Sequence, residues 1–166
     1  MQEKCFEEVL KRFPEGNVTL SQLNLMTYVD TVLKETKRLH PPVPIIARKL
    51  GKDTKFEGRL LPKGLNVAIH LKTLHTNPKY WKNPETFNPD RFSRFESKEM
   101  DPFQFIPFSA GVRNCLGQKF ALLQEKIILV KVLSRFRILP GSEDPAEIAN
   151  LVLRSENGIS VRFEDR

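Results

Sequence analysis

One of the two cysteines in the sequence has the setting of a metal-binding thiol. Cys115 lies between Gly111 and Gly117, and Arg113 stands two residues before it. Gly111 could turn a loop at positive φ, and the missing Cβ at Gly117 would let backbone approach a flat partner closely. The apolar periodicity after Gly117 predicts a helix, whose free N–H groups would favour a thiolate at Cys115. A thiolate on a rigid loop facing a flat partner is what axial ligation of haem iron requires.

The ten residues around this cysteine match a known family pattern. Residues 108–117 resemble the haem-binding loop of cytochromes P450, and all five fixed positions of that loop are present: Phe108, Gly111, Arg113, Cys115 and Gly117. The resemblance implies that Cys115 is the axial ligand of haem b, iron protoporphyrin IX. It also implies that Phe108 packs on the ligand side and that Arg113 pairs with a haem propionate. From the residues alone, the alternative is a small buried cysteine at a loop–helix junction.

A carboxylate placed inward on a predicted helix gives a second motif. Within residues 25–39, Glu35 falls among the apolar positions of the helix, and Arg38 follows three residues later on the same face. A buried acid is costly unless it is paired and hydrogen-bonded. The alternative is an exposed i,i+3 ion pair, which contributes little to stability.

This pair resembles the Glu-x-x-Arg motif of the P450 K helix, and a third segment completes the set. Residues 88–92 resemble the family's Pro-Glu-Arg-Phe segment, with Asp90 in place of the usual glutamate. The resemblance implies that Glu35, Arg38 and Arg91 form a buried salt-bridged triad that fixes the cysteine loop. Arginine suits such a role because its planar fork can satisfy a carboxylate from two directions.

The remaining periodicity predicts short strands and two further helices. Prolines end the helix after His40. Strands are expected at residues 45–48, 54–61 and 66–71, helices at 1–13 and 117–136, and a hairpin around the Asn157-Gly158 turn within residues 151–163. The Pro- and Asn-rich residues 76–107 match the P450 meander, with anchors that would be buried: Trp81, Phe87, Phe92, Phe103 and Phe105. The wide apolar stripe of residues 117–136 predicts that much of this helix is buried.

The expected fold class is mainly α with small β-sheets (α+β). By resemblance it is the C-terminal part of the P450 fold: helices J to L, the meander, the cysteine loop and a terminal β-hairpin. The resemblance implies that Arg48 reaches a haem propionate, although a solvated strand residue is an equal reading of that position. It also places a group of residues in the substrate pocket: Val43, Pro44, Ile45, Ile46, Leu151 and Val152.

Composition narrows the function classes. The 166 residues carry a formal charge of +7 and no apolar run long enough to span a membrane. The basic residues are scattered, so an acidic protein partner is favoured over nucleic acid. Two cysteines do not make a disulfide framework, which indicates a reducing compartment. The three histidines lack zinc-ligand spacing to Cys115, whereas a catalytic Cys–His pair stays open because such partners meet only in the fold.

The resemblance covers residues 1–166 as the C-terminal portion of a single P450 domain. The family's Ala-Gly-x-Asp/Glu-Thr segment and its N-terminal membrane anchor are not found in the sequence. We therefore expect a fragment of a longer protein that neither binds haem tightly nor is active alone. Residues 108–121 and 41–50 look most like family four, the microsomal group that includes fatty-acid ω-hydroxylases, with Val112 in place of its usual proline.

The activity implied is insertion of one oxygen atom of O2 into a lipophilic, fatty-acid-like or xenobiotic substrate. Electrons would come from NADPH through a separate NADPH–cytochrome P450 reductase, which would dock on a basic face that includes Lys119. The parent protein would lie at the endoplasmic reticulum membrane, on its cytosolic face. Two alternatives stay open: a haem-thiolate enzyme that rearranges peroxides without a reductase, and an inactive product of a truncated gene.

Overall fold

The computed structural model describes residues 1–14, 17–93 and 100–166. Its helices are α1 (Gln2–Arg12), α2 (Leu20–Asn24), α3 (Thr27–Leu39), α4 (Leu71–His75) and α5 (Gln118–Leu133), with short 3-10 turns η1 (Pro89–Phe92) and η3 (Gly111–Arg113). Its strands are β1 (Ile45–Lys49), β2 (Thr54–Phe56), β3 (Arg59–Leu61), β4 (Asn66–His70), β5 (Phe136–Pro140), β6 (Glu147–Ala149), β7 (Leu153–Ser155) and β8 (Val161–Asp165).

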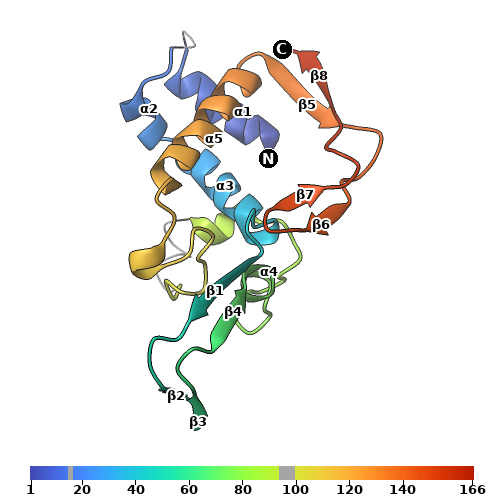
Figure 1. Cartoon of the computed structure of the whole chain (residues 1–166). Coiled ribbons are helices and arrows are strands. Elements are labelled where there is room, and N and C mark those ends of the chain that lie inside the picture. Colours follow the sequence, from blue (N-terminus) through green and yellow to red (C-terminus); the bar gives the residue numbers. More distant parts are fainter. Residues whose placement is uncertain (15–16, 94–99) are drawn as a thin grey trace.

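The hydrophobic core lies where α1, α3 and α5 meet, with α2 beside them (Figure 1). Apolar faces at helical spacing drive this packing, because their burial removes apolar surface from water. The buried core residues are Cys5, Val9, Phe13, Leu23, Met26, Val29, Val130 and Leu133. Cys5, the second cysteine of the sequence, is thus a core residue.

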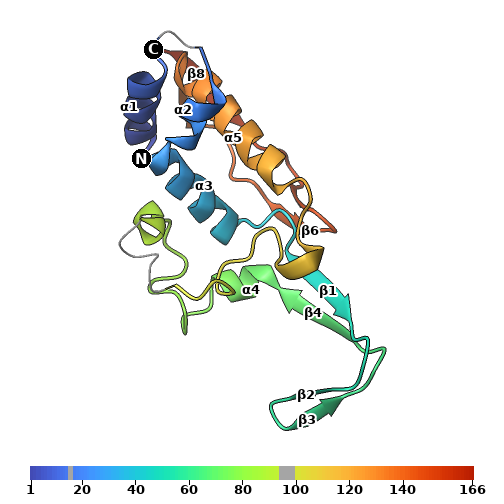
Figure 2. The same ribbon diagram turned by 90° about the vertical axis from the view of Figure 1, so that its left-hand side faces the viewer.

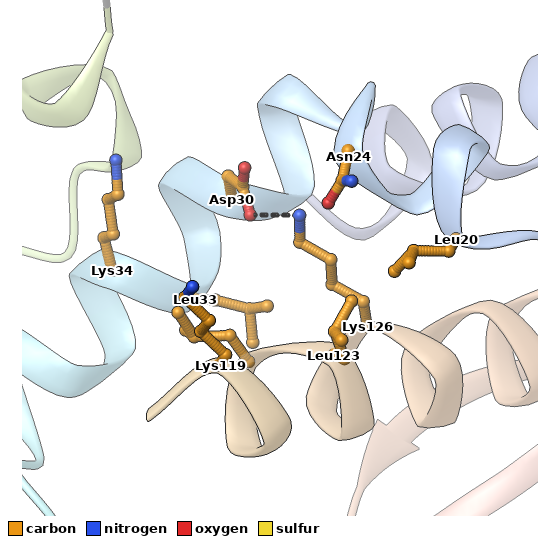
Figure 3. Close-up of a pocket in the computed structure, with 9 residues that line it drawn as sticks. Leu20, Asn24, Asp30, Leu33, Lys34, Lys119, Leu123 and Lys126 are labelled. Carbon is orange, nitrogen blue, oxygen red and sulfur yellow. Dashed lines mark ion pairs between the residues drawn. The ribbon is translucent and has the colours of Figure 1, made fainter. Parts of the chain in front are cut away.

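Two ion pairs fasten α5 to α3 beside this core. Lys126 Nζ lies 2.8 Å from Asp30 Oδ1 and donates to the carbonyl of Leu23 at 2.9 Å (Figure 3). Lys37 Nζ lies 2.5 Å from Glu125 Oε2. Since both lysines are nearly buried, these contacts fix the register of α5 along α3.

The described strands form four separate two-stranded antiparallel sheets: β1–β4, β2–β3, β5–β8 and β6–β7. In β1–β4, Ala47 pairs with Ala68 and Arg48 with Val67. The β1–β4 ribbon leads away from the helices, and β2–β3 continues it to the far end (Figure 2). The predicted fold class, helical with small sheets, is confirmed.

The pairing expected across the Asn157-Gly158 turn is wrong. β7 pairs with β6, and β8 pairs with β5, so the strands on the two sides of this turn belong to different sheets. The Asn157 side chain explains the difference, because its Oδ1 accepts the N–H of Ala146 at 2.8 Å and its Nδ2 donates to Asp144 O at 3.0 Å. The turn is thereby held against the loop before β6, and the hairpin of this region is β6–β7.

The expected burial of α5 is also wrong within this chain. Only Lys126, Val130 and Leu133 of this helix are buried, whereas Phe120 and Ile128 are exposed. The apolar stripe is wider than the surface that α1, α2 and α3 offer to it. Within the described part of the chain, no helix combines the length and apolar character that a bilayer crossing requires.

The start of α3 is capped by a carboxylate from α1. Glu8 Oε1 accepts the N–H groups of Thr27 at 2.7 Å and Tyr28 at 3.1 Å, and Glu8 Oε2 accepts that of Val29 at 2.8 Å. The first N–H groups of a helix lack partners within the helix and carry partial positive charge, so a carboxylate satisfies both requirements. This contact orients α3, the helix that carries Glu35.

We predict that Glu8→Ala lowers the free energy of unfolding by about 1–2 kcal/mol, the range typical of a lost cap. Glu8→Gln should lose less, because an amide oxygen still accepts hydrogen bonds. Urea unfolding of the variants measures the effect, and Glu7→Ala, at an exposed position of the same helix, is the matched control. Equal losses at both positions would show that the cap does not stabilise α3.

Candidate functional site

The candidate site is the loop that leads into α5 and carries Cys115. The backbone closes the loop at its base, since the N–H of Cys115 donates to the carbonyl of Phe108 at 2.9 Å. Inside the loop, Asn114 N–H donates to Gly111 O at 3.2 Å across the turn η3. Gly111 has a φ of +75°, a conformation that glycine adopts without steric cost. Backbone bonds therefore hold the thiol-bearing residue at a defined place two residues before the N-cap Gly117.

The outer surface of this loop is apolar and uncovered in this chain. Cys115 is an exposed free cysteine, and the exposed fractions are 101% for Val112, 102% for Leu116 and 72% for Phe120. Contiguous exposed apolar surface around a thiol is typical of a surface that receives a ligand or partner. Among the described residues, no N–H group donates to the sulfur of Cys115.

Gly117 has no conformational reason of its own to be glycine. Its φ is −82°, which any residue adopts, and a Cβ added there would meet only Cys115 Sγ at 4.0 Å, an ordinary contact. A flat group lying over the thiol would need this space. The glycine, the exposed thiol and the surrounding apolar residues thus fit a porphyrin ligated through sulfur.

Two arginines stand at the loop, and they differ in the hydrogen bonding of their guanidinium groups. Arg48, on β1, donates from Nη2 to Ser109 Oγ at 2.7 Å and to Arg113 O at 3.2 Å, and from Nη1 to Ala47 O at 2.9 Å. Arg113 contributes its carbonyl to this contact, and its own guanidinium has no partner among the described residues. The structure thus brings together both arginines that the sequence proposed as propionate contacts.

Glu35, Arg38 and Arg91 lie together in the interior. Arg38 Nε and Nη2 donate to the two oxygens of Glu35 at 2.8 and 2.9 Å, and Arg91 Nε lies 3.4 Å from Glu35 Oε1. The side chains of Glu35 and Arg38 are fully buried. The Asn88 N–H also donates to Glu35 Oε1, at 2.8 Å. A bidentate arginine and a backbone donor supply the compensation that a buried carboxylate requires.

The two arginines also bind the backbone of the segment between α4 and η1. Arg38 donates from Nη1 to His75 O at 2.9 Å and from Nη2 to Thr86 O at 3.3 Å. Arg91 donates to the carbonyls of Lys82 and Asn83. The ion cluster therefore sets the course of residues 75–91 as well as satisfying its own charges.

His75 links this cluster to the cysteine loop, and sequence reasoning missed it. The His75 side chain is fully buried, and its Nε2 accepts the N–H of Ile106 at 3.1 Å. Ile106 lies two residues before Phe108, whose carbonyl closes the loop. Its ring also lies 5.2 Å from that of Phe105. No motif surrounds His75 in the sequence, so only its burial, which depends on the fold, could have revealed it.

Burial lowers the pKa of His75 from 6.5 to about 4, and the nearby positive charge of Arg38 acts in the same direction. Nε2 accepts a hydrogen bond, so the neutral ring carries its proton on Nδ1. A protonated ring would lose the acceptor and place a second positive charge beside Arg38. The link between the ion cluster and Ile106 therefore requires neutral His75.

Aromatic side chains fill the space behind the loop. Trp81 and Phe92 are buried, and their rings lie 5.9 Å apart, with Phe105 next to Phe92 at 4.7 Å. Phe87 is half-buried. Phe103, which follows Pro102 in a turn, is 66% exposed, so its predicted role as a buried anchor is wrong. Residues 94–99 of the predicted meander lie outside the described residues.

The residues proposed for the substrate pocket come from two separate segments. The N–H of Leu153 donates to Pro42 O at 2.7 Å, which brings Leu151 and Val152 to the start of β1. Val43, Ile45, Leu151 and Val152 are exposed, Ile46 is half-buried, and Pro44 is buried with its carbonyl bonded to Leu71 N–H. Glu147 reinforces the junction by binding both His40 and Lys72, whose hydrogen bonds lower the pKa of its carboxyl.

A closed loop with an exposed thiol, an apolar surround and two adjacent arginines fits the haem-thiolate class of proteins. The family model for cytochrome P450 matches residues 1–163, and the chain belongs to that family. Haem is the cofactor that this membership implies. The resemblance inferred from residues 108–117 is confirmed.

Individual relatives agree with the family match. The chain is 42% identical over 163 residues to cytochrome P450 4Z1 of Homo sapiens, which covers 96% of this chain and 32% of that relative. It is 40% identical over 171 residues to probable cytochrome P450 4p2 of Drosophila melanogaster and 41% identical over 167 residues to human cytochrome P450 4F2, covering 99% and 98% of this chain. The chain spans about a third of the length of these relatives. Their names place the similarity within group four, as the sequence predicted.

We predict that Glu35→Gln lowers the free energy of unfolding by about 3–5 kcal/mol, because buried Arg38 and half-buried Arg91 lose their counter-charge. Denaturant unfolding monitored by circular dichroism measures the loss. Glu85→Gln, an exposed carboxylate in the neighbouring loop, should change stability by less than about 0.5 kcal/mol. A loss below about 1 kcal/mol at Glu35 would contradict the role of the buried cluster.

Neutral His75 makes stability depend on pH in a defined window. The folded-state pKa of about 4 lies below the ordinary 6.5, so above pH 6.5 this contribution is fully present. As the pH falls from 6.5 to 4 the unfolded chain takes up a proton that the folded chain does not, and stability decreases. We predict that His75→Gln has a shallower decline in this window, whereas exposed His70→Gln keeps the original slope. Identical slopes in all three proteins would exclude a buried neutral His75.

Proposed function

We propose that residues 1–166 form the C-terminal, haem-ligating portion of a single cytochrome P450 domain, with Cys115 as the axial iron ligand. The observation that supports this proposal most directly is the exposed thiol of Cys115, on a loop closed by a backbone hydrogen bond. The neighbouring apolar side chains of Val112, Leu116 and Phe120 are exposed as well. Cys5 does not compete for this role, because it is buried in the helical core and burial raises the pKa of its thiol to about 11. A thiol with such a pKa does not offer the thiolate that binds iron.

Each residue that matches the family's loop pattern receives a distinct role. Gly111 turns the chain and Gly117 leaves space for the porphyrin plane. Phe108 contributes its carbonyl to the closure of the loop and its ring to the ligand side. The guanidinium of Arg113 has no partner among the described residues, and Arg48 retains N–H groups beyond its three hydrogen bonds, so both can pair with the propionates. The buried cluster of Glu35, Arg38 and Arg91 holds the segment behind the loop.

The activity proposed is monooxygenation of a lipophilic, fatty-acid-like or xenobiotic substrate. Bound haem supplies the activation of O2, while the thiolate of Cys115 tunes its electron density. The apolar residues at the junction of β1 and β7, among them Val43, Ile45 and Leu151, form one wall for an apolar substrate and exclude water. Family membership and the group-four relatives support this activity.

Electrons would come from NADPH through a separate NADPH–cytochrome P450 reductase. The exposed lysines Lys34 and Lys119, on α3 and α5, line a pocket between these two helices and offer a positive surface to an acidic flavoprotein (Figure 3). The site proposed for the complete protein is the cytosolic face of the endoplasmic reticulum membrane, as is usual for a microsomal group. The formal charge of +7 supports docking of an acidic partner.

The test is a matched pair of cysteine substitutions in the haem-loaded complete protein that contains residues 1–166. Cys115→Ser should abolish the thiolate-type Soret band of the ferrous–CO complex, because serine offers no thiolate. Cys5→Ala should retain the band with only a loss of stability of about 1–2 kcal/mol. Retention of the thiolate-type band in Cys115→Ser would contradict the proposed ligand.

A further inference from the structure

Ser109 has a backbone conformation that is unfavourable for its residue type. Its φ is +64°, in the left-handed region where a Cβ is crowded and glycine is favoured. The residue lies in the cysteine loop, one position after Phe108, whose carbonyl closes that loop. Residues held in such conformations at functional sites persist when the surrounding structure requires them. A feature specific to the serine side chain is therefore expected here.

The hydroxyl of Ser109 makes one specific contact, and the partner comes from outside the loop. Ser109 Oγ accepts a hydrogen bond from Arg48 Nη2 at 2.7 Å, and the same nitrogen donates to the carbonyl of Arg113 at 3.2 Å. One guanidinium on β1 thus binds the loop on both sides of η3 (Gly111–Arg113). A hydrogen bond from a charged donor is among the stronger kinds.

The remaining hydrogen-bonding capacity of Arg48 is also defined. Arginine has five N–H groups in a fixed planar arrangement. Three are used on Ala47 O, Ser109 Oγ and Arg113 O, which leaves one on Nη1 and the one on Nε without a partner among the described residues. These two groups are available to an anion, and the guanidinium plane that presents them is fixed by the Ser109 contact.

Resting on the haem-binding role proposed above, we propose that Ser109 is a positioning residue that holds Arg48 against the cysteine loop for its contact with a haem propionate. The hydroxyl restrains the guanidinium, and the guanidinium in turn stabilises the left-handed serine. The loop and β1 are thereby joined beside the ligand residue, so the cysteine and the propionate contact keep a constant relative position. Loss of the hydroxyl leaves the charge of Arg48 in place but lets it move.

The simplest opposing view is that the loop needs only a small residue at position 109. Ser109→Gly separates these views, because glycine accepts a φ of +64° without strain and removes only the hydroxyl. Ser109→Ala removes the hydroxyl and keeps the strain. Glu57→Gly is the matched control, since Glu57 is an exposed left-handed residue on the distant β2–β3 turn.

The experiment is a double-mutant cycle of Ser109→Gly and Arg48→Gln in the haem-loaded protein. Haem dissociation, followed by transfer to an excess of apomyoglobin, should accelerate roughly tenfold in Ser109→Gly, as expected for one lost charge-assisted hydrogen bond. The midpoint potential of the haem should fall, because a restrained cation near the propionate favours the reduced iron. Arg48→Gln should show at least the same changes, and the double variant should match Arg48→Gln alone.

Additive effects in the double variant, or a Ser109→Gly protein with unchanged haem dissociation and potential, would overturn the role of Ser109. Glu57→Gly should leave both quantities at the original values; equal changes there would also overturn it. If the complete protein without substitutions lacks a thiolate-type ferrous–CO band, the haem-binding role and this inference are overturned together. A normal band with additive losses would overturn the inference alone.

Discussion

A single buried carboxylate constrains much of this structure. Glu35 is fully removed from solvent, and its two oxygens are satisfied by Arg38, Arg91 and the backbone of Asn88. An unpaired charge in that place would cost several kcal/mol, so these groups must reach Glu35 together or the region does not form. Because they come from one helix and from a segment more than fifty residues later, the ion cluster couples α3 to the irregular chain before the cysteine loop.

Two supports reach the loop from different directions. On the inner side, Arg38 binds the backbone of His75, and His75 binds the backbone of Ile106 just ahead of the loop. On the outer side, Arg48 of β1 binds Ser109 and Arg113. The loop is thus held between a buried polar network and an exposed cation, while the thiol itself stays accessible. Such an arrangement keeps a ligand residue in place before its cofactor binds.

Site residues could be predicted from the sequence where a short local pattern marks the same residues that make the tertiary contacts. Glu35 and Arg38 share a helix face, so their inward placement follows from periodicity, and the loop motif around Cys115 is contained in ten residues. Glu8 and His75 could not be found in this way, because their partners lie 19 to 31 residues away and meet them only in the fold.

Predictions from local sequence patterns were wrong where contacts with distant segments determine the structure. Asn157-Gly158 is a good turn, yet β8 pairs with β5, more than twenty residues earlier, and the Asn157 side chain binds the loop before β6. The apolar stripe of α5 predicted burial from its width, whereas burial depends on what packs against the helix, and Phe120 and Ile128 remain exposed. The prediction that Phe103 is buried was wrong for the same reason, because an aromatic residue type alone does not determine whether the side chain is buried.

The central claim is that iron is bound through the sulfur of Cys115, and X-ray absorption at the iron edge of the ferric haem-loaded protein tests it most directly. The account predicts one sulfur ligand in addition to the four porphyrin nitrogens, and its replacement by a lighter ligand when residue 115 lacks sulfur. Coordination by nitrogen and oxygen alone in the unsubstituted protein would contradict it.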